Sequence, residues 1–468
     1  MSLSIFDKKG HKWLFVDSFM ILPKSLKKLT TDFNVKHKKK EMDYENIRNE
    51  KWEKYLKYDC IGLYEVMRKF EDIVNNFGCN LETTISRQAL AMFQTTLKHR
   101  IPNYPKYEKF IRSGYYGGRC EIFKMHGENL NYYDINSLYP YCMMENEMPI
   151  GIPMRKHGKP PEDSIAFCEA KVKIPEDMYI PPLPIRMNGK LIFPVGKIKG
   201  VWDFEELKMA EEYGCEINYI KSLYFRKKDY IFRDHVTNWY KIKNETDRNS
   251  ALYTIAKLIL NSLYGKFGQR REGKKIIFKP QRDEFVGLTP LYEDYGIYEK
   301  DEISTSTHIL PAISSHITAL SRIELYKWMV SIDSSQINTY YCDTDSIITT
   351  EKLKTSTKLG GMKLEKKADE GIFLLPKLYI LRTAEDFEIK IKGYDRAREK
   401  LNFKSYEKAL YNDDYSDFLV SFKRFGLFSE NIRRNKPILS MVERKKSIKT
   451  SYDKRIRTDN YDTIPIKY

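Results

Sequence analysis

The chain has 468 residues and a formal net charge of +17, with 81 Lys and Arg against 64 Asp and Glu. This length exceeds one ordinary hydrophobic core and predicts several domains. The charge favours a partner with a dense negative backbone, although a lysine-rich proteome would produce the same excess. The seven cysteines are scattered without a C-x-x-C pair, which excludes a zinc site or disulfide framework of the usual spacing and indicates a reducing intracellular compartment. No apolar run of about 18 residues and no signal-like N-terminus occurs, so we expect a soluble, non-secreted protein with no membrane partner, whose compartment stays open.

Residues 1–100 are helical in character. A lysine-rich run at 36–40 is predicted to be a solvated linker surface, with DNA contact as the alternative. Tyr55 and Asp59 form a Y-x-x-x-D pattern in this region.

Residues 101–145 contain two short patterns. The first is Tyr115-Tyr-Gly117-Gly118, in which a glycine pair lets backbone N–H groups approach a phosphate chain closely. The second is the apolar run that ends at Asp134 and is followed by a turn. It predicts a strand that presents a carboxylate at its end.

A proline-rich segment follows, with strand character at 190–195 and helical character at 203–212. Residues 256–268 then predict a helix closed by glycine. Lys257, Asn261 and Tyr264 lie on one face of this helix, and the apolar residues lie on the other. The lysine offers a point charge to a triphosphate, whereas an ordinary surface helix is the alternative.

A basic run at 270–275 opens a second insert, which ends before a helix predicted at 309–326. Residues 340–348 predict a β-hairpin with Asp343 and Asp345 at its tip, because the flanks are β-branched and aromatic and the tip has turn chemistry. Alternating apolar residues at 373–381 predict further strands. Basic runs that include 433–434 and 444–446 mark the C-terminal part.

The three acidic residues indicate metal-dependent phosphoryl transfer. Two cations about 3.5–4 Å apart clamp the attacking and leaving oxygens of an in-line displacement, and they need carboxylates from separate strands. Magnesium suits such a site because it prefers oxygen ligands and keeps several waters. Asp134 and Asp345 are the expected bridging ligands, with Asp343 in support. The alternative for the hairpin taken alone is a solvated acidic loop.

Together these patterns resemble family B DNA polymerases, specifically the protein-primed branch of phages, adenoviruses and linear plasmids. D-x-x-S-L-Y-P, K-x-x-x-N-S-x-Y-G and Y-x-D-T-D-S stand in the family's order, and Y-x-G-G and K-x-Y elements accompany them. The resemblance covers roughly residues 12–430. It implies an α/β fold, a right-hand polymerase with an antiparallel palm, helical fingers and a small thumb, plus a partial RNase H-like exonuclease domain.

The resemblance also implies a division of the chain. The expected parts are a partial exonuclease-like domain at 1–100, palm at 101–145 and 309–380, a first terminal-protein-region-like insert at 146–235, fingers at 236–268, a second such insert at 269–308, and thumb with basic tail at 381–468. The second insert is expected to help encircle the template and separate strands.

Site residues follow from the same resemblance. It implies that Asp134, Asp343 and Asp345 are catalytic and bind metal; that Ser137, Leu138, Tyr139, Lys257, Asn261 and Tyr264 bind the nucleotide; and that Tyr115, Gly117, Gly118, Gly265, Lys377 and Tyr379 bind DNA. The Tyr139 ring would stack under the deoxyribose and clash with a 2′-hydroxyl. Some relatives carry a basic residue where this chain has Tyr253, so a second triphosphate contact comes from Arg248 or Lys243, or is absent.

Tyr55 and Asp59 fit the third exonuclease element of the family, but no D-x-E pair or further matching Asp precedes them. Hydrolysis by two metals needs about four carboxylates. We therefore expect no 3′→5′ exonuclease activity from this chain. The missing part is either supplied by a separate chain or lost.

The expected function is that of a nucleotidyltransferase that adds dNTPs to a 3′-hydroxyl on primer-template DNA with two Mg²⁺ ions, Mn²⁺ being a possible substitute. The resemblance implies a terminal protein as priming partner and a linear viral or plasmid genome. The alternatives are a primer-independent family B polymerase and an inactive or auxiliary DNA-binding subunit.

Overall fold

The computed structural model describes residues 2–6, 9, 11–41, 52–278, 287–292, 296–332, 338–392, 400–425, 431, 441–447 and 452–468. The basic pair at 433–434 lies outside these ranges. None of the helices within them is both long and apolar enough to cross a membrane.

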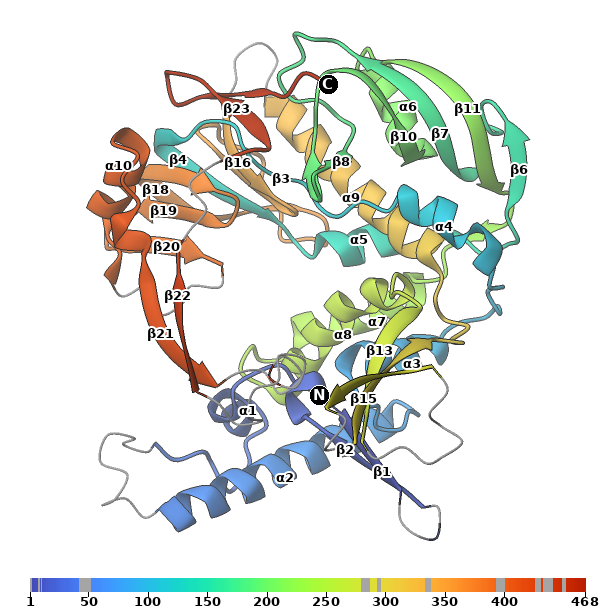
Figure 1. Cartoon of the computed structure of the whole chain (residues 1–468), viewed down its shortest axis with the longest axis vertical. Coiled ribbons are helices and arrows are strands. Elements are labelled where there is room, and N and C mark those ends of the chain that lie inside the picture. Colours follow the sequence, from blue (N-terminus) through green and yellow to red (C-terminus); the bar gives the residue numbers. More distant parts are fainter. Residues whose placement is uncertain are drawn as a thin grey trace.

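A seven-stranded antiparallel sheet lies on the left of the upper body in Figure 1. Its strands, in spatial order, are β20 (Phe387–Ile391), β19 (Leu378–Arg382), β18 (Met362–Leu375), β4 (His126–Ile135), β17 (Ser346–Thr349), β16 (Thr339–Asp343) and β3 (Cys120–Ile122). The hairpin and the later strands predicted from the sequence are therefore confirmed. The expected palm boundary at 380 falls inside β19, and the sheet continues through β20.

The sheet buries a different set of side chains on each face, as the two-residue period of strands requires. Tyr133 and Ile135 pack with α5 (Leu138–Glu145) and α9 (Pro311–Ile332). Tyr341 and Ile348 pack into the cluster that includes α10 (Phe403–Tyr411). The catalytic candidates stand where these strands end.

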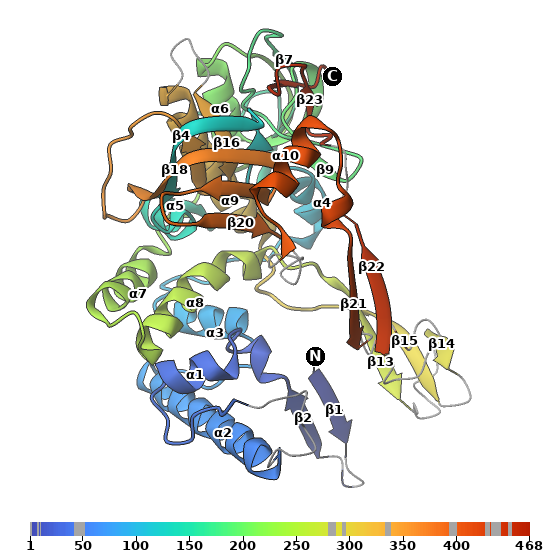
Figure 2. The same ribbon diagram turned by 90° about the vertical axis from the view of Figure 1, so that its left-hand side faces the viewer.

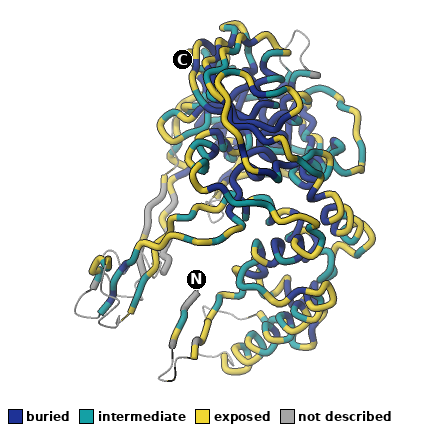
Figure 3. Tube along the Cα trace, turned by 90° about the vertical axis from the view of Figure 1, so that its right-hand side faces the viewer, coloured by how far each residue is buried: buried dark blue, intermediate teal, exposed yellow. Residues whose placement is uncertain are grey.

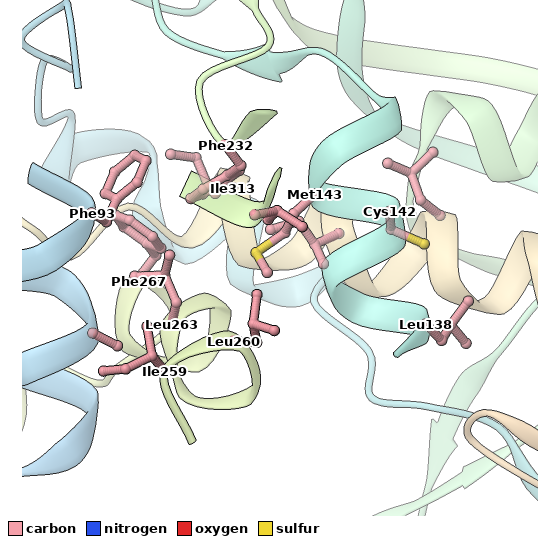
Figure 4. Packing of buried hydrophobic residues seen from close by; sticks show 14 of the residues in the cluster. Phe93, Leu138, Cys142, Met143, Phe232, Ile259, Leu260, Leu263, Phe267 and Ile313 are labelled. Carbon is pink, nitrogen blue, oxygen red and sulfur yellow. The ribbon is translucent and has the colours of Figure 1, made fainter. Parts of the chain in front are cut away.

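The helix predicted at 256–268 is confirmed as α8 (Ala251–Phe267), which Ser250 caps at its start and Gly268 ends. It follows α7 (Arg233–Glu245) and packs on α3 (Ile85–Gln94). Figure 4 shows Phe93 of α3 beside Phe267, Ile259 and Leu263 of α8. The opposite face, with Lys257 and Asn261, is exposed.

The N-terminal part contains α1 (Leu26–Asp32), α2 (Trp52–Asn76), α3 and then α4 (Pro105–Ser113). It opens on a hairpin, β1 (Ser2–Phe6) and β2 (Lys12–Val16), where the sequence pattern predicted helical character. Trp13, Leu14 and Phe15 of β2 are exposed, and Figure 3 contrasts this hairpin with the buried interior of the upper body.

The first insert forms its own layer. Strands β10 (Gly196–Asp203), β7 (Ile165–Ile174), β11 (Glu216–Phe225) and β6 (Met154–His157) make a four-stranded antiparallel sheet, covered by α6 (Phe204–Glu212). Smaller strand pairs are β5 (Met148–Pro149) with β12 (Lys228–Asp229) and β8 (Ile185–Met187) with β9 (Lys190–Ile192). The strand and helix expected near 190 and 203 are both present.

The second insert is a three-stranded sheet of β13 (Glu272–Phe278), β15 (Ile297–Ile303) and β14 (Leu288–Tyr292). Figure 2 shows a further hairpin, β21 (Val420–Phe425) with β22 (Met441–Lys446), projecting from the body below α10. The chain ends with β23 (Arg455–Arg457) and β24 (Thr463–Pro465), which return to the palm side of the molecule.

Candidate active site

Strand register brings the three acidic residues together. Asp134 on β4 lies opposite Ser346 on β17, and the backbone N–H of Ile135 donates to the carbonyl of Asp345 at 2.7 Å. Asp343 ends β16 and pairs with Ser346 across the hairpin. The carboxylates of the two distant sequence patterns thus stand at one edge of adjacent strands.

Two of these carboxyl groups are held in an electrostatically unfavourable environment. Burial, with the negative charges of Asp345 and Glu365, raises the pKa of Asp134 to about 7. Burial and the charge of Asp343 raise the pKa of Asp345 to about 6. Such shifts are typical of functional sites, because the ionised cluster lacks the positive charge that would stabilise it.

Asp343 differs because Lys377 neutralises it. The Lys377 Nζ lies 2.7 Å from Oδ1 and 2.5 Å from Oδ2 of Asp343. Lys377 occupies the turn between β18 and β19 with a left-handed φ of 64°, and its backbone N–H donates to the Tyr341 hydroxyl at 3.0 Å. The expected DNA-binding lysine is therefore paired with a catalytic candidate.

Tyr379 is not presented at the surface. It is 4% exposed, and its ring lies 5.1 Å from that of Tyr341. Tyr379 can therefore influence a primer end only through the residues that it packs against.

The carboxylate cluster fits divalent cations whose coordination is completed by other oxygens. Within the described residues, no group of three or more Asp, Glu, His or Cys side chains closes around a metal by itself. Magnesium is usually held by one or two carboxylates together with substrate phosphates and water, so an incomplete protein cage suits it. The unsatisfied negative charge of Asp134 and Asp345 supplies the attraction.

Two tyrosine rings border the carboxylates. Tyr139 on α5 and Tyr264 on α8 stack with centroids 4.2 Å apart and an interplanar angle of 17°. Leu138 is 1% exposed, so its side chain serves the core and only its backbone remains for a nucleotide. Gly265 on α8 is exposed beside Tyr264.

Positive charge gathers on the fingers side. Lys243 on α7 donates from Nζ to the Ser137 Oγ at 3.0 Å. Burial and the charges of Lys257 and Arg248 lower the pKa of the Lys243 ammonium, while Asp134 acts in the opposite direction. The structure thus places the Lys243 ammonium near the carboxylates, whereas the sequence left open whether Lys243, Arg248 or neither would supply this charge.

The Y-x-G-G loop lies against the tip of the acidic hairpin. A Cβ on Gly118 would come within 2.8 Å of the Thr344 side chain, and the Thr344 N–H donates to the Arg119 carbonyl at 2.7 Å. Glycine is therefore required for this close approach. Gly117 is exposed and has open space around it.

A cleft of about 400 Å³ joins these elements. Its lining includes five expected residues: Tyr115, Gly117, Gly118, Tyr139 and Tyr264. It also includes five residues that were not among the expected site residues: Arg112, Arg186, Gly268, Arg270 and Thr318. A polar, arginine-lined cleft next to carboxylates suits a phosphate-bearing ligand.

Arg322 on α9 is a further residue that sequence reasoning missed. It forms a two-pronged ion pair with Glu206 of α6, at 2.7 Å for both contacts, and donates to the carbonyls of Tyr116 and Gly117 at 2.7 and 2.9 Å. Its side chain is 2% exposed, and that of Glu206 is fully buried. The first insert therefore helps to hold the Y-x-G-G loop.

Tyr55 and Asp59 lie on α2, at the opposite end of the molecule from the carboxylate strands (Figure 1). Asp59 accepts from the Lys39 Nζ at 2.5 Å, and Tyr55 accepts from the same ammonium. Lys40 covers the ring of Tyr58 at 4.1 Å. The lysine run is therefore partly a packing surface, which corrects the expectation of a purely solvated linker.

Comparisons with known proteins place this geometry in a family. The profile described as "DNA polymerase type B, organellar and viral" matches residues 49–353. A probable DNA polymerase of Neurospora intermedia is 30% identical over 87% of this chain and 50% of its own length, and one of Ascobolus immersus is 27% identical over 97% and 43%. The chain thus spans about half or less of these fungal relatives.

A phage relative and a solved structure agree with this family. The DNA polymerase of Bacillus phage phi29 is 27% identical over 90% of this chain and 73% of its own length. A structure of phi29 DNA polymerase complexed with primer-template DNA and incoming nucleotides matches with a TM-score of 0.74 and 21% identity, covering 96% of this chain and 83% of that one. The structural likeness shows that the right-hand polymerase fold is shared.

Proposed function

The chain belongs to the organellar and viral type B DNA polymerases, and we propose that it adds dNTPs to the 3′-hydroxyl of a primer as its template directs. The observation that carries this proposal is the placement of Asp134, near the end of β4, next to Asp345 in the turn before β17, beside the stacked pair Tyr139 and Tyr264. Acidic groups, a base-sized ring surface and nearby cations are the components that nucleotidyl transfer requires.

Divalent metal dependence is general to this family. We assign Asp134 and Asp345 as the ligands of two Mg²⁺ ions, with Asp343 in support. When bound, the ions would stabilise the negative charge that develops on the 3′-oxygen and offset the charge of the triphosphate. The raised pKa values of Asp134 and Asp345 support this assignment, because burial and neighbouring negative charges destabilise the ionised carboxylates and a bound cation would offset that cost.

The remaining groups orient the substrates. We assign Lys243, Lys257 and Asn261 to the triphosphate of the incoming dNTP; the contact of Lys243 with Ser137 and the place of the other two on α8 support this assignment. The Tyr139 ring would support the sugar and exclude a 2′-hydroxyl. Lys377 would hold Asp343 in place and leave it when the primer end approaches.

The arginine-lined cleft is the proposed path of the template strand. Tyr115, Gly117 and Gly118 line it, and the exposed Gly265 follows the lining residue Tyr264 on α8. Glycine backbone lets phosphates approach closely. The net charge of +17 predicts binding that weakens steeply with salt.

We further propose that synthesis starts on a terminal protein. The similarity to the phage phi29 polymerase supports this step, as do the separate sheets formed by the two segments that we assign as inserts. The partner would supply the hydroxyl that receives the first nucleotide. A labelled dNTP recovered on a protein band, rather than on DNA alone, tests protein priming; starts without any protein product would identify a primer-independent enzyme.

Primer extension tests the central proposal. The purified chain is incubated with primed single-stranded DNA, Mg²⁺ and dNTPs, and both lengthening and 3′ shortening of the labelled primer are scored. Template-dependent lengthening is expected. Failure to extend, with DNA binding retained, would instead indicate an auxiliary DNA-binding subunit. Shortening that Asp59→Ala abolishes would overturn the expected lack of exonuclease activity.

A further inference from the structure

Both ends of the second insert meet at a single carboxylate, that of Glu108 on α4. Its Oε1 accepts from Arg112 Nε at 2.7 Å, and its Oε2 accepts from Arg271 Nε at 2.6 Å. The Glu108 side chain is 13% exposed, so these pairs are shielded from much of the solvent screening that weakens surface pairs. One carboxylate therefore joins two arginines with different partners.

Arg112 holds the start of the insert. It donates from Nη1 to the Gly268 carbonyl at 2.9 Å and from Nη2 to the Gln269 carbonyl at 2.6 Å. These carbonyls end α8, where a cation is favoured by the helix dipole. Arg112 thus fixes the point at which the chain leaves the fingers.

Arg271 holds the end of the insert. It donates from Nη1 to the Ser306 carbonyl at 3.1 Å and from Nη2 to the Asn103 side chain at 2.9 Å. Two backbone bonds close the same base: the Ser304 N–H donates to the Arg271 carbonyl, and the Leu310 N–H donates to the Phe267 carbonyl, both at 2.8 Å. The two ends of the insert are thereby tied together.

Strands β13, β14 and β15 pair with one another, and none of the described residues between 272 and 303 belongs to the three buried hydrophobic clusters. The ion pairs and hydrogen bonds of Glu108, Arg112 and Arg271 therefore form a clamp that joins the base of this sheet to α4.

We propose that Glu108 is a positioning residue that fixes the second insert relative to the arginine-lined cleft. Helix α4 leads directly into the Y-x-G-G loop, so the same helix that carries Glu108 also places Tyr115. The insert and the cleft then present one continuous surface to nucleic acid. The inference rests on the proposed polymerase function and extends it from one nucleotide addition to sustained synthesis.

The test compares single addition with sustained synthesis in the full chain. Glu108→Gln keeps the shape and removes the charge, and Arg271→Lys keeps a charge but loses the forked donor geometry. The control is Glu71→Gln, which removes an exposed helical pair with Arg68. The rate of adding the first nucleotide and the product length from one binding event, with competitor DNA in excess, are measured.

In both test variants we expect first-nucleotide addition within about twofold of wild type and product length reduced about tenfold, because a mispositioned insert affects retention more than chemistry. The control should match wild type in both. Loss of both quantities in equal proportion, or an unchanged product length, would overturn the positioning role.

Hydrogen exchange reports the clamp without relying on activity. In Glu108→Gln, the Ser304 and Leu310 amides should exchange about tenfold faster, because an opened base exposes their hydrogen bonds. Unchanged exchange would overturn the clamp itself. A wild-type chain that adds no nucleotide would refute the proposed function, and the role of Glu108 in synthesis with it, while the exchange result would still decide whether the clamp exists.

Discussion

Lys377 holds Asp343 through both carboxylate oxygens, at 2.7 Å and 2.5 Å. Within the part of the chain that the structure describes, neither Asp134 nor Asp345 has an ion pair of this kind. The three acidic residues therefore divide into one neutralised carboxylate and two whose charge is unsatisfied. This division matches a supporting role for Asp343 and direct metal binding for the other two.

Asp134→Asn and Asp345→Asn should each abolish synthesis and leave primer-template binding within about threefold, because an amide keeps the shape but cannot supply the charge that divalent ions require. Primer extension and a DNA-binding titration at one fixed salt concentration measure the two effects. Asp369→Asn, on β18, is the matched control. Retained synthesis in either active-site variant would remove the metal assignment.

Although these substitutions should abolish synthesis, they should stabilise the metal-free folded chain at neutral pH and above. The pKa of Asp134 is about 7 in the folded chain, above the ordinary 3.8, so the folded state binds more protons than the unfolded state between these values. Stability from this group is therefore present at low pH and is lost as pH rises toward 7. After allowance for solvent screening, the loss is on the order of 2 kcal/mol.

Metal-free Asp134→Asn should accordingly melt at a higher temperature than the metal-free wild type at pH 8, and the difference should shrink toward pH 5. Thermal unfolding in EDTA across this range measures it. Added Mg²⁺ should then raise the wild-type midpoint more than that of the variant. A stability difference that is independent of pH would show that the folded chain does not destabilise the ionised form of Asp134.

Lys243 offers a test of the triphosphate contact. Lys243→Ala should raise the KM for dNTP roughly tenfold or more with a smaller effect on DNA binding, because a charge-assisted hydrogen bond contributes about 1.5–3 kcal/mol. Lys241→Ala, on the exposed side of the same helix, is the matched control. Steady-state kinetics of single-nucleotide addition provide the measurement, and equal effects of both variants would argue for a general electrostatic role only.

The candidate site could be predicted from the sequence where the chemistry is local. Asp343 and Asp345 are recognisable because turn residues separate two β-branched and aromatic runs, and Lys257 because it shares a helical face with Asn261. The register that places Asp134 opposite Ser346 depends on pairing between distant strands, and only the family resemblance anticipated it.

Residues whose role arises from burial could not be found in this way. Arg322 and Glu206 are ordinary charged residues in their own helices, and they meet only because α9 packs on α6. The β2 strand was missed for a related reason: its apolar run lacks strict alternation, so its period does not separate a strand from a helix.

Tyr139 should control the choice of sugar. Tyr139→Val is expected to reduce the preference for dNTP over rNTP by at least about tenfold, because the ring that we propose excludes a 2′-hydroxyl is replaced by a smaller side chain. Tyr139→Phe keeps the ring and the stacking on Tyr264, so it should retain the preference. The ratio of kcat/KM for the two nucleotides is the readout. Equal ratios in the two variants would show that the ring is not the selecting group.

Arg322 should matter for stability and for DNA binding together. Arg322→Gln leaves the fully buried Glu206 without its partner, and removing one member of a buried pair costs about 3–5 kcal/mol. The double variant Arg322→Gln/Glu206→Gln should recover part of this loss, because no buried charge is left uncompensated. Both variants also remove guanidinium donors from the carbonyls of Tyr116 and Gly117, so primer-template affinity should stay reduced even where stability returns. Thermal unfolding and DNA titration separate the two effects, and an affinity that recovers in step with stability would show that Arg322 supports the fold without positioning the Y-x-G-G loop.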